Sequence, residues 1–418
     1  MAIETDKKKV AIVCDWLTNV GGAEKVLLRV HRLYPKAPIY TSKYDSSGID
    51  WFKDADVRTG WMQVFPSFLR RVLGPFRQWY FSRLDLSEYD LIISVTGAEA
   101  KSVKSGSWLA RHGKKSKNPK GIHVSYCHVP TQYYWQMYDD YVRNPGFGIL
   151  NPLIRFFFRL FVVPLRKADL RAAQRPDYFV TISKYAEEAI KKYYGREAKV
   201  VNPPVEIKDF QMNKSSSVAC PSDTLKAVRP SLRSSEHTTP ELLPFGYYIT
   251  SSRQVNWKRI DLAVKACMMT QRKLVIIGEG PEHKKLMKLA AGSGLVKFLP
   301  VMKKKELASW LARAKGYLFP SMEPFGIAPV EALAAGCPVI AYEVGGAKDY
   351  VVDGKNGVLF SEQTAASLAE AILKFEKRKF NRERVAKTAL KFDETRFDKE
   401  LKDFVKKCEK QNGKKKSK

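Results

Sequence analysis

Short apolar runs alternate with helix-type stretches along most of this chain, in two separate series. Helical periodicity at Ala23–Leu33, Ser183–Tyr194 and Lys303–Ala314 fills gaps between the apolar runs. A strand–helix rhythm of this kind predicts parallel sheets covered by helices. The predicted strands are Val10–Asp15, Leu91–Val95, His123–His128, Tyr178–Ile182 and Lys199–Val201, followed by Tyr247–Thr250, Leu274–Gly278, Lys297–Leu299, Gly316–Phe319, Pro338–Tyr342 and Gly357–Phe360.

A change of composition separates the two series. Residues 212–243 are rich in Ser, Pro, Thr and Lys and lack apolar periodicity, which is typical of a linker or a disordered insertion. The 418 residues suit two domains. We expect an α/β fold of two Rossmann-like, doubly wound domains facing across a cleft, where the strands' carboxyl ends bind nucleotides. The expected ranges are 1–205 for the first domain, 206–244 for the linker and 245–418 for the second domain with its basic, helical, lysine-ending tail.

The charge balance concerns partners more than fold. The chain has 73 Lys and Arg against 43 Asp and Glu, a formal net charge of +30. Such a charge favours nucleic acid, an anionic membrane surface or phosphorylated ligands. The six scattered cysteines contain no CxxC pair and indicate reduced thiols in a cytoplasmic protein. The most apolar stretch, Ile149–Leu165, is interrupted by Arg155 and Arg159, so we expect a soluble or peripheral protein.

The strongest motif runs from Ser321 to Gly336, directly after a predicted strand. Pro329 suits the first turn of a helix and Gly336 its end. Glu323 then lies in the strand–helix loop and Glu331 in the first helical turn. Carboxylates accept hydrogen bonds from sugar hydroxyls, and free amides at a helix start bind phosphate. Taken alone, Glu323 would be interpreted as a charged loop residue and Glu331 as a residue that favours a helix N-terminus. The two together predict a sugar-nucleotide site.

Two cations follow the first predicted strand of the second domain. Arg253 and Lys258 lie in a loop that leads into the helix Asp261–Cys267. Cations near a helix start oppose the helix dipole, so this placement favours a function over a structural role. Two cations at a strand's carboxyl end can neutralise a departing diphosphate without a metal ion.

Two weaker signals lie in the first domain. Gly21 and Gly22 precede a helix and permit close approach of the backbone to a phosphate. His128 ends a predicted strand and can hydrogen-bond a sugar hydroxyl, although a lone histidine is usually structural. The full G-x-G-x-x-G fingerprint is absent here, and Gly278-Glu279-Gly280 continues into Pro281, which disfavours a dinucleotide dehydrogenase.

Together these residues resemble glycosyltransferase family 4, a retaining family with the GT-B fold. The resemblance covers almost the whole chain and includes the E-x₇-E element from Glu323 to Glu331. It implies that Glu323 contacts the donor sugar, Glu331 the ribose, and Arg253 and Lys258 the diphosphate. The backbones of Phe325, Gly326 and Ile327 approach sugar and phosphate, Gly22 of the Gly21-Gly22 turn approaches the β-phosphate, and His128 approaches the transferred sugar. No metal or other cofactor is implied.

The run Tyr126–Trp135 resembles a bacterial branch that includes mannosyltransferases of cell-surface polysaccharide assembly. GDP-mannose is the donor this favours. Pro300 stands where the family commonly has glycine, in a loop near the base, which leaves base preference open.

The acceptor is expected on the first domain, as a saccharide or a lipid-linked saccharide at the cytoplasmic membrane face. Pro152–Arg166 and Pro66–Arg83 mix apolar side chains with arginines, among them Arg155, Arg159, Arg166 and Arg77, and residues 102–120 add six cations and no acid. Basic amphipathic helices fit an anionic bilayer. The alternative is ordinary packing helices with an arginine edge.

Three other functions fit parts of the sequence. Asp54-Ala55-Asp56 is a D-x-D triplet, as in metal-dependent GT-A transferases, but the two-domain layout opposes that reading. The charge of +30 suggests nucleic-acid binding, yet the cations are dispersed and no binding module appears. The third alternative is a GT-B protein that binds a sugar nucleotide but does not transfer the sugar. The presence of all four residues Arg253, Lys258, Glu323 and Glu331 argues against it.

Overall fold

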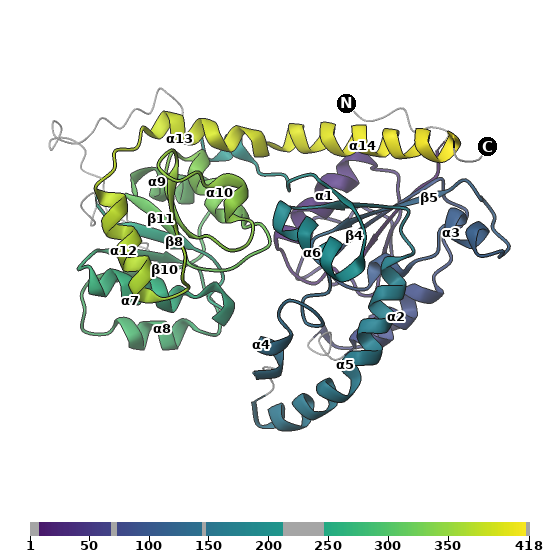
Figure 1. Ribbon diagram of the computed structural model, residues 1–418, viewed down its shortest axis with the longest axis horizontal. Coiled ribbons are helices and arrows are strands. Elements are labelled where there is room, and N and C mark those ends of the chain that lie inside the picture. The colour runs from purple at the N-terminus through teal and green to yellow at the C-terminus, as the bar shows by residue number, and fades with distance from the viewer. Residues whose placement is uncertain (1–7, 68–72, 144–147, 212–245, 415–418) are drawn as a thin grey trace. The chain divides into compact units, whose positions relative to one another are not determined.

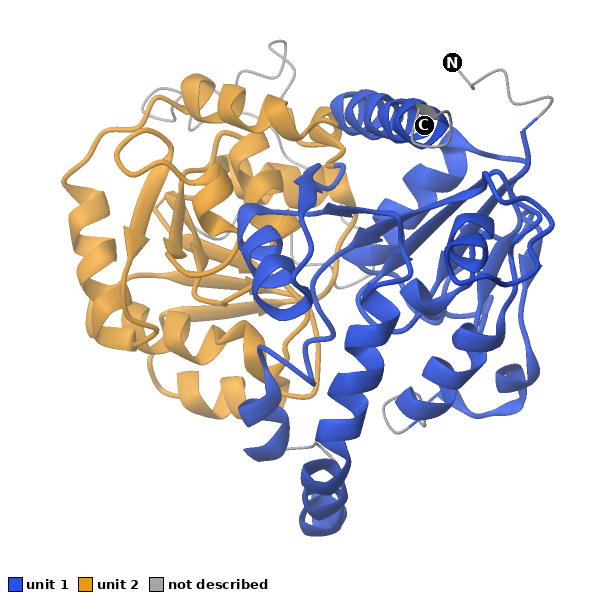
Figure 2. Cartoon of the chain, turned by 45° about the vertical axis from the view of Figure 1, so that its right-hand side comes forward, with its two compact units in different colours: residues 1–204, 394–418 blue, residues 205–393 orange. Residues whose placement is uncertain are grey.

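The computed structural model describes residues 8–67, 73–143, 148–211 and 246–414. They form two compact units, coloured separately in Figure 2: unit 1 comprises residues 1–204 with 394–418, and unit 2 comprises residues 205–393. The sequence placed all of 245–418 in the second domain, whereas the described part of the tail, residues 394–414, groups with unit 1. The expected linker segment, 212–243, lies outside the described residues.

Unit 1 is built on a seven-stranded parallel sheet in the order β3-β2-β1-β4-β5-β6-β7 (Figure 1). Strands β2 and β3 were not predicted, because runs this short carry no alternation to detect. The strands are β1 Val10–Cys14, β2 Ile39–Thr41, β3 Val57–Arg58, β4 Leu91–Thr96, β5 Ile122–Cys127, β6 Tyr178–Thr181 and β7 Ala198–Val200.

Helices cover the unit 1 sheet. Phe81 packs on the sheet face formed by Ala11, Val13 and Ile92. The C-terminal helix joins unit 1 through Arg29, which donates to Asp398 at 2.6 and 2.7 Å and to Glu394 at 3.0 Å. The helices are α1 Gly22–Leu33, α2 Gly74–Arg83, α3 Gly106–Arg111, α4 Tyr138–Arg143, α5 Asn151–Ala173, α6 Lys184–Tyr194 and α14 Glu394–Lys414, with short 3-10 turns η1 Trp61–Val64, η3 Ala100–Ser102 and η4 Gly148–Leu150.

Unit 2 has a six-stranded parallel sheet in the order β10-β9-β8-β11-β12-β13. Its strands are β8 Tyr248–Ser251, β9 Leu274–Ile277, β10 Val296–Leu299, β11 Gly316–Phe319, β12 Val339–Tyr342 and β13 Gly357–Phe360. Apolar side chains of α7, α8 and α12 form one large core with these strands. The helices are η5 Ile207–Asp209, η8 Asn256–Lys258, α7 Ile260–Met269, α8 His283–Ala290, α9 Lys304–Arg313, α10 Ile327–Ala334, α11 Ala347–Tyr350, α12 Ala365–Glu376, α13 Arg382–Ala389 and η9 Leu390–Phe392.

The predicted architecture is confirmed. Every strand expected from the sequence is present, with each end within one residue of the prediction. Both strand orders place the first strand of the unit centrally and wind outward on both sides, which is the doubly wound Rossmann-like arrangement. The five cysteines in the described ranges are free and buried, and Cys220 lies outside them.

Helix α5 departs from expectation. Together with η4 it forms a segment, Gly148–Ala173, that is long and apolar enough to cross a membrane by length and composition alone, since it contains an 18-residue window of mean hydropathy 1.5. No other helix in the described ranges meets that criterion. Arg155 and Arg159 therefore interrupt the apolar run less than the sequence analysis assumed.

Candidate active site

Two predicted residues of unit 2 meet directly. The Lys258 ammonium donates to Glu323 Oε1 at 2.5 Å, which joins the η8 turn after β8 to the loop after β11. Both side chains are partly exposed, at 22% and 19%. A pair that remains open to solvent can exchange its partner for a ligand, because neither charge is fully desolvated.

The loop after β12 fixes the backbone of Glu323. Gly346 N–H donates to Glu323 O at 2.8 Å, and Gly345 forms an isolated bridge with Glu323. Gly345 has φ +97°, and a Cβ there would lie 2.4 Å from Glu323 O. Ser321 Oγ also donates to Glu323 Oε1 at 2.9 Å. The sequence analysis missed this support, although a Gly-Gly pair two residues after a strand is a recognisable signal of close backbone approach.

Gly326 directly precedes helix α10, in a conformation that favours glycine. Its φ is +90°, and a Cβ would lie 2.7 Å from Phe319 Cζ and 2.9 Å from Tyr350 Oη. Ile327 is the first helical residue, so its backbone N–H belongs to the first turn, whose N–H groups have no partner within the helix. The Phe325 side chain is buried among aromatic rings, which leaves only its backbone for a ligand.

Glu331 lies one turn further along α10 than expected. The helix starts at Ile327, two residues before Pro329, so Glu331 falls in the second turn. Gly336, with φ +76°, follows the helix end as predicted. Glu331 is 9% exposed and belongs to the same helix as the amide end.

Arg253 is exposed and lies beside Trp257, with Cζ 5.9 Å from the indole centroid. Its loop is held close to β9 by two glycines. A Cβ on Gly278 would lie 2.2 Å from Ser252 O, and one on Gly280 would lie 2.3 Å from Gln254 O. The Gly278-Glu279-Gly280 run is therefore explained by backbone packing that positions Arg253.

His128, in unit 1, follows β5. Its Nε2 is buried and has no hydrogen-bond partner among the described residues. Burial lowers the pKa of His128 to about 4 despite the opposing effect of Asp15, so the ring is neutral near pH 7. A neutral imidazole with an unpartnered nitrogen is suited to a hydrogen bond with a ligand hydroxyl.

The β1 end of unit 1 carries a carboxylate that the sequence analysis did not single out. Asp15 accepts hydrogen bonds from Thr96 Oγ1 at 2.9 Å and from three backbone N–H groups of residues 97–100. It thereby fixes the turn after β4. Gly21 caps α1 in extended backbone and Gly22 is the first helical residue, so both lie at the amide end of that helix.

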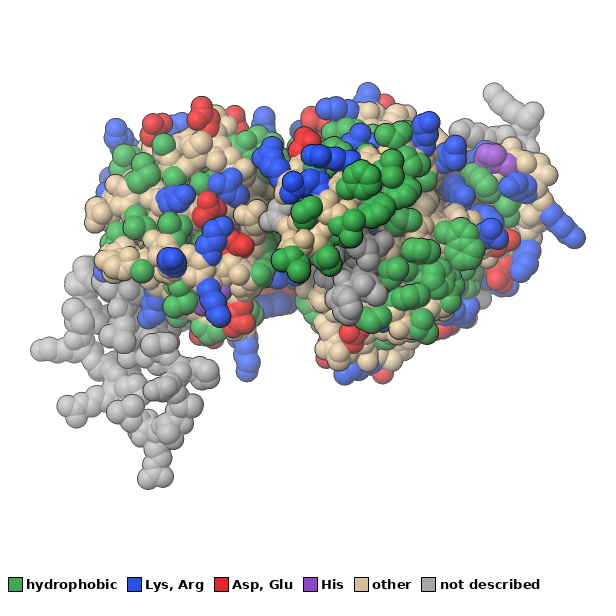
Figure 3. All heavy atoms as spheres, turned by 90° about the horizontal axis from the view of Figure 1, so that it is seen from below, with side chains coloured by type: hydrophobic (Ala, Val, Ile, Leu, Met, Phe, Trp, Pro, Cys, Tyr) green, Lys and Arg blue, Asp and Glu red, His purple; other side chains and the backbone are tan. Residues whose placement is uncertain are grey.

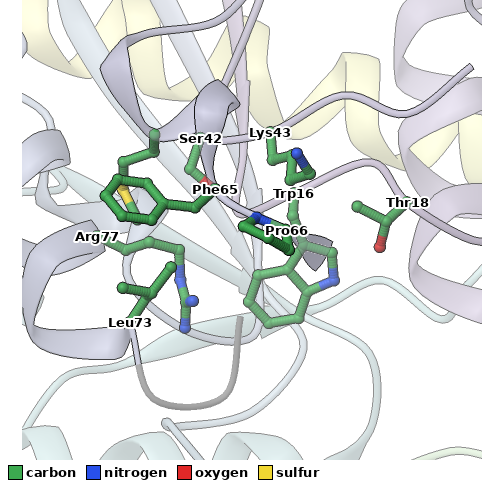
Figure 4. Close-up of a pocket in the computed structure, with 9 residues that line it drawn as sticks. Trp16, Thr18, Ser42, Lys43, Phe65, Pro66, Leu73 and Arg77 are labelled. Carbon is green, nitrogen blue, oxygen red and sulfur yellow. The ribbon is translucent and has the colours of Figure 1, made fainter. Parts of the chain in front are cut away.

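A pocket of about 300 Å³, including its open mouth, lies in unit 1 (Figure 4). Trp16 and Arg77 line it face to face, with the guanidinium carbon 4.8 Å from the ring centroid. Arg77 is buried and pairs with Glu99 at 3.0 Å, so it is not the membrane-facing arginine that the sequence suggested. The other lining residues are Thr18, Ser42, Lys43, Met62, Phe65, Pro66 and Leu73.

Within the described ranges, no group of three or more His, Cys, Asp or Glu side chains is placed to hold a metal ion. In the D-x-D triplet, Asp56 is ion-paired with Arg58 at 2.7 Å.

Comparison with known proteins gives the fold first. HepE from Anabaena, in complex with UDP, superposes with a TM-score of 0.63 at 18% identity, covering 96% of this chain and 100% of HepE. Sucrose-phosphate synthase from Thermosynechococcus elongatus gives 0.63 at 15% identity, covering 96% and 99%. At these identities the likeness shows the fold alone, and that fold is GT-B, as predicted.

Sequence comparison then identifies one domain. Residues 244–392 match the family described as glycosyl transferases group 1, so the chain carries a domain of that family there. A D-inositol 3-phosphate glycosyltransferase from Nocardioides sp. is 36% identical over 124 residues, 27% of this chain and 27% of that protein. The chain spans well under half the length of the first curated relatives it matches.

Proposed function

We propose that this chain is a retaining glycosyltransferase that moves a hexose from a nucleotide diphosphate sugar to an acceptor without a metal. The observation that carries the proposal is the Lys258–Glu323 pair inside the group 1 domain, beside the amide end of α10. This places a cation, a carboxylate and free backbone amides at one edge of a parallel sheet.

The proposed chemistry divides among these groups. The donor's anomeric C–O bond breaks with oxocarbenium character, and negative charge develops on the leaving diphosphate. Lys258, Arg253 and the α10 amides stabilise that charge. Glu323 and His128 accept or donate hydrogen bonds to the sugar, Glu331 binds the ribose, and the Gly21-Gly22 turn approaches the phosphate. The acceptor hydroxyl attacks from the face that the diphosphate leaves, and a leaving-group oxygen takes its proton.

For the donor we propose mannose from GDP-mannose, with uridine sugars as the main competitors because HepE binds UDP. For the acceptor we propose a saccharide or lipid-linked saccharide of cell-surface polysaccharide assembly, at the cytoplasmic face of a membrane. The unit 1 pocket that Trp16 and Arg77 line is the proposed acceptor contact, since an indole face suits a sugar ring.

One experiment tests donor and activity together. Thermal-shift measurements with GDP-mannose, UDP-glucose and ADP-glucose identify the bound donor, and release of the nucleoside diphosphate from it is then followed with chelator present. Stabilisation by one sugar nucleotide together with diphosphate release supports the proposal. Binding without release favours a non-catalytic sugar-nucleotide protein, and no stabilisation by any of the three overturns the proposal.

A further inference from the structure

The outward face of helix α5 is apolar. Six side chains of Asn151–Ala173 are each about half or more exposed, between 45% for Phe157 and 62% for Phe156. At about 100° per residue they occupy one arc of about 160° on the helix. We call this set the α5 apolar face; its members are Leu153, Phe156, Phe157, Leu160, Phe161 and Val163.

The opposite side of α5 is the side that packs. Val162 and Asp169 are buried, and Phe158 lies against Tyr138 of α4 with ring centroids 5.7 Å apart. The helix thus has two apolar faces, one against the domain and one against solvent. A helix that only closed a protein core would carry polar residues on its outer face.

A second group of exposed apolar side chains lies on the neighbouring helix of unit 1. Phe76 and Trp79 of α2 are 55% and 50% exposed, and Trp61 of η1 is 5.9 Å from Trp79 between ring centroids. Helices α2 and α5 contact one another. Figure 3 shows hydrophobic side chains gathered over much of this face, with few acidic side chains among them. An exposed apolar surface of this extent marks an interaction site.

Charge decides which partner fits. Arg159 is exposed and lies about 40° beyond one edge of the apolar arc. A second copy of this chain would bring a further formal charge of +30 and its own Arg159 against this one. An anionic bilayer instead offers hydrocarbon to the apolar arc and phosphates to Arg159. Arg155 and Arg166 take no part, because Arg155 donates to Arg143 O, and Arg166 donates to Tyr134 O and stacks on Trp135.

The packing of α5 on unit 1 limits how deeply the helix can enter a bilayer. Asp169 is ion-paired to Lys101 inside unit 1, and Val162 is buried there, so the helix from Val162 onward belongs to the domain. The remaining helical residues, 151–161, span about 16 Å, whereas the hydrocarbon core of a bilayer is about 30 Å thick. Although Gly148–Ala173 is long and apolar enough for a membrane span, it cannot cross a bilayer without dismantling unit 1.

We propose that the α5 apolar face inserts into one leaflet of an anionic bilayer, with Arg159 at the level of the lipid phosphates and Trp61 and Trp79 at the interface. This deepens the membrane association proposed above by naming the surface that carries it. Binding to vesicles is measured without a sugar donor, so a failure here is distinguishable from a failure of the transferase proposal.

The test is flotation of the full chain with vesicles of equimolar phosphatidylcholine and phosphatidylglycerol. The variant carries Leu153→Ser, Phe157→Ser and Leu160→Ser. The matched control carries Met269→Ser, Met287→Ser and Val301→Ser, which remove exposed apolar side chains from unit 2. All six positions are exposed, so both variants should melt close to the wild type.

The wild type and the control should float, with binding that persists in salt sufficient to screen surface charge, and the α5 variant should bind on the order of tenfold or more weakly. Equal flotation of the α5 variant and the wild type would overturn the proposal, and so would complete release of the wild type by salt. Light scattering without vesicles measures whether the chain forms a dimer. If the wild type does not float but forms a dimer that the α5 variant loses, the α5 apolar face is assigned to contact with a second copy.

Discussion

Each unit holds a lysine–carboxylate pair near the carboxyl edge of its parallel sheet, and the two pairs differ in what surrounds them. In unit 1, Lys101 and Asp169 are 1% and 2% exposed. Asp169 also accepts from Thr131, Trp135 and Tyr194, so the buried carboxylate is fully engaged. In unit 2, Lys258 and Glu323 are 22% and 19% exposed.

This difference in exposure distinguishes a structural ion pair from a pair that can bind a ligand. Burial alone would lower the pKa of Lys101, but the Asp169 carboxylate raises it well above its ordinary value, so the ammonium is locked in its charged form. Such a pair has no capacity left for a ligand. The exposed pair of unit 2 can rearrange around a phosphate or a sugar hydroxyl. The same two residue types therefore predict opposite consequences when the lysine is replaced.

Lys101→Met should produce the largest effect. It leaves Asp169 charged and buried without a cation, which costs about 3–5 kcal/mol of unfolding free energy. Urea denaturation of the variant measures this. Lys191→Met is the control, because the Lys191–Glu197 pair is 69% and 81% exposed and its loss should be barely measurable. If the two variants were equally stable, the buried pair would have no structural role.

Lys258→Met should show the reverse pattern. We expect kcat/KM to fall by about 10²–10³-fold, since charge develops on the diphosphate in the transition state, while the melting temperature changes little. The rate of transfer from the best donor measures it. Lys304→Met, which removes another ion-paired lysine of unit 2, should keep normal activity. Near-normal kcat/KM in Lys258→Met would remove Lys258 from the reaction.

Gly345→Ala tests whether the backbone of Glu323 must be held in place. The added Cβ would meet Glu323 O, and φ +97° strains any other residue, so we expect a loss of about 1–3 kcal/mol together with reduced activity. Gly292→Ala is the matched control, because Gly292 also has a positive φ, +76°, but open space surrounds the new Cβ. If both variants lost the same stability and neither lost activity, contact between Gly345 and Glu323 would be unimportant.

All strands but β2 and β3, and the Glu323–Glu331 motif, could be predicted from the sequence, because the longer buried strands are local apolar runs and Gly326, Pro329 and Gly336 mark a helix locally. The packing of α14 on unit 1 could not, since it depends on Arg29 meeting Asp398 across most of the chain. The same holds for Arg77, which appeared to be one arginine of a basic helix until Glu99 was found beside it. Long-range ion pairs leave no periodic signal.

The last prediction concerns the protonation of a buried histidine. His123 is fully buried in β5, its Nδ1 has no hydrogen-bond partner among the described residues, and burial lowers its pKa to about 4. The unfolded chain, with an ordinary histidine pKa near 6.5, binds the proton more readily. Stability is therefore lost as pH falls from about 6.5 toward 4, by at most about 1.4 kcal/mol per pH unit from this residue.

His123→Leu should lessen that dependence, so its melting temperature relative to the wild type should rise as the solution is acidified through this window. His112→Leu, at an exposed position of unit 1, should track the wild type. A constant difference between His123→Leu and the wild type across the window would mean that His123 is not the group that titrates. The buried charge of Lys101 would then remain as the polar group that unit 1 pairs completely, and His128 as the buried imidazole that unit 1 keeps neutral.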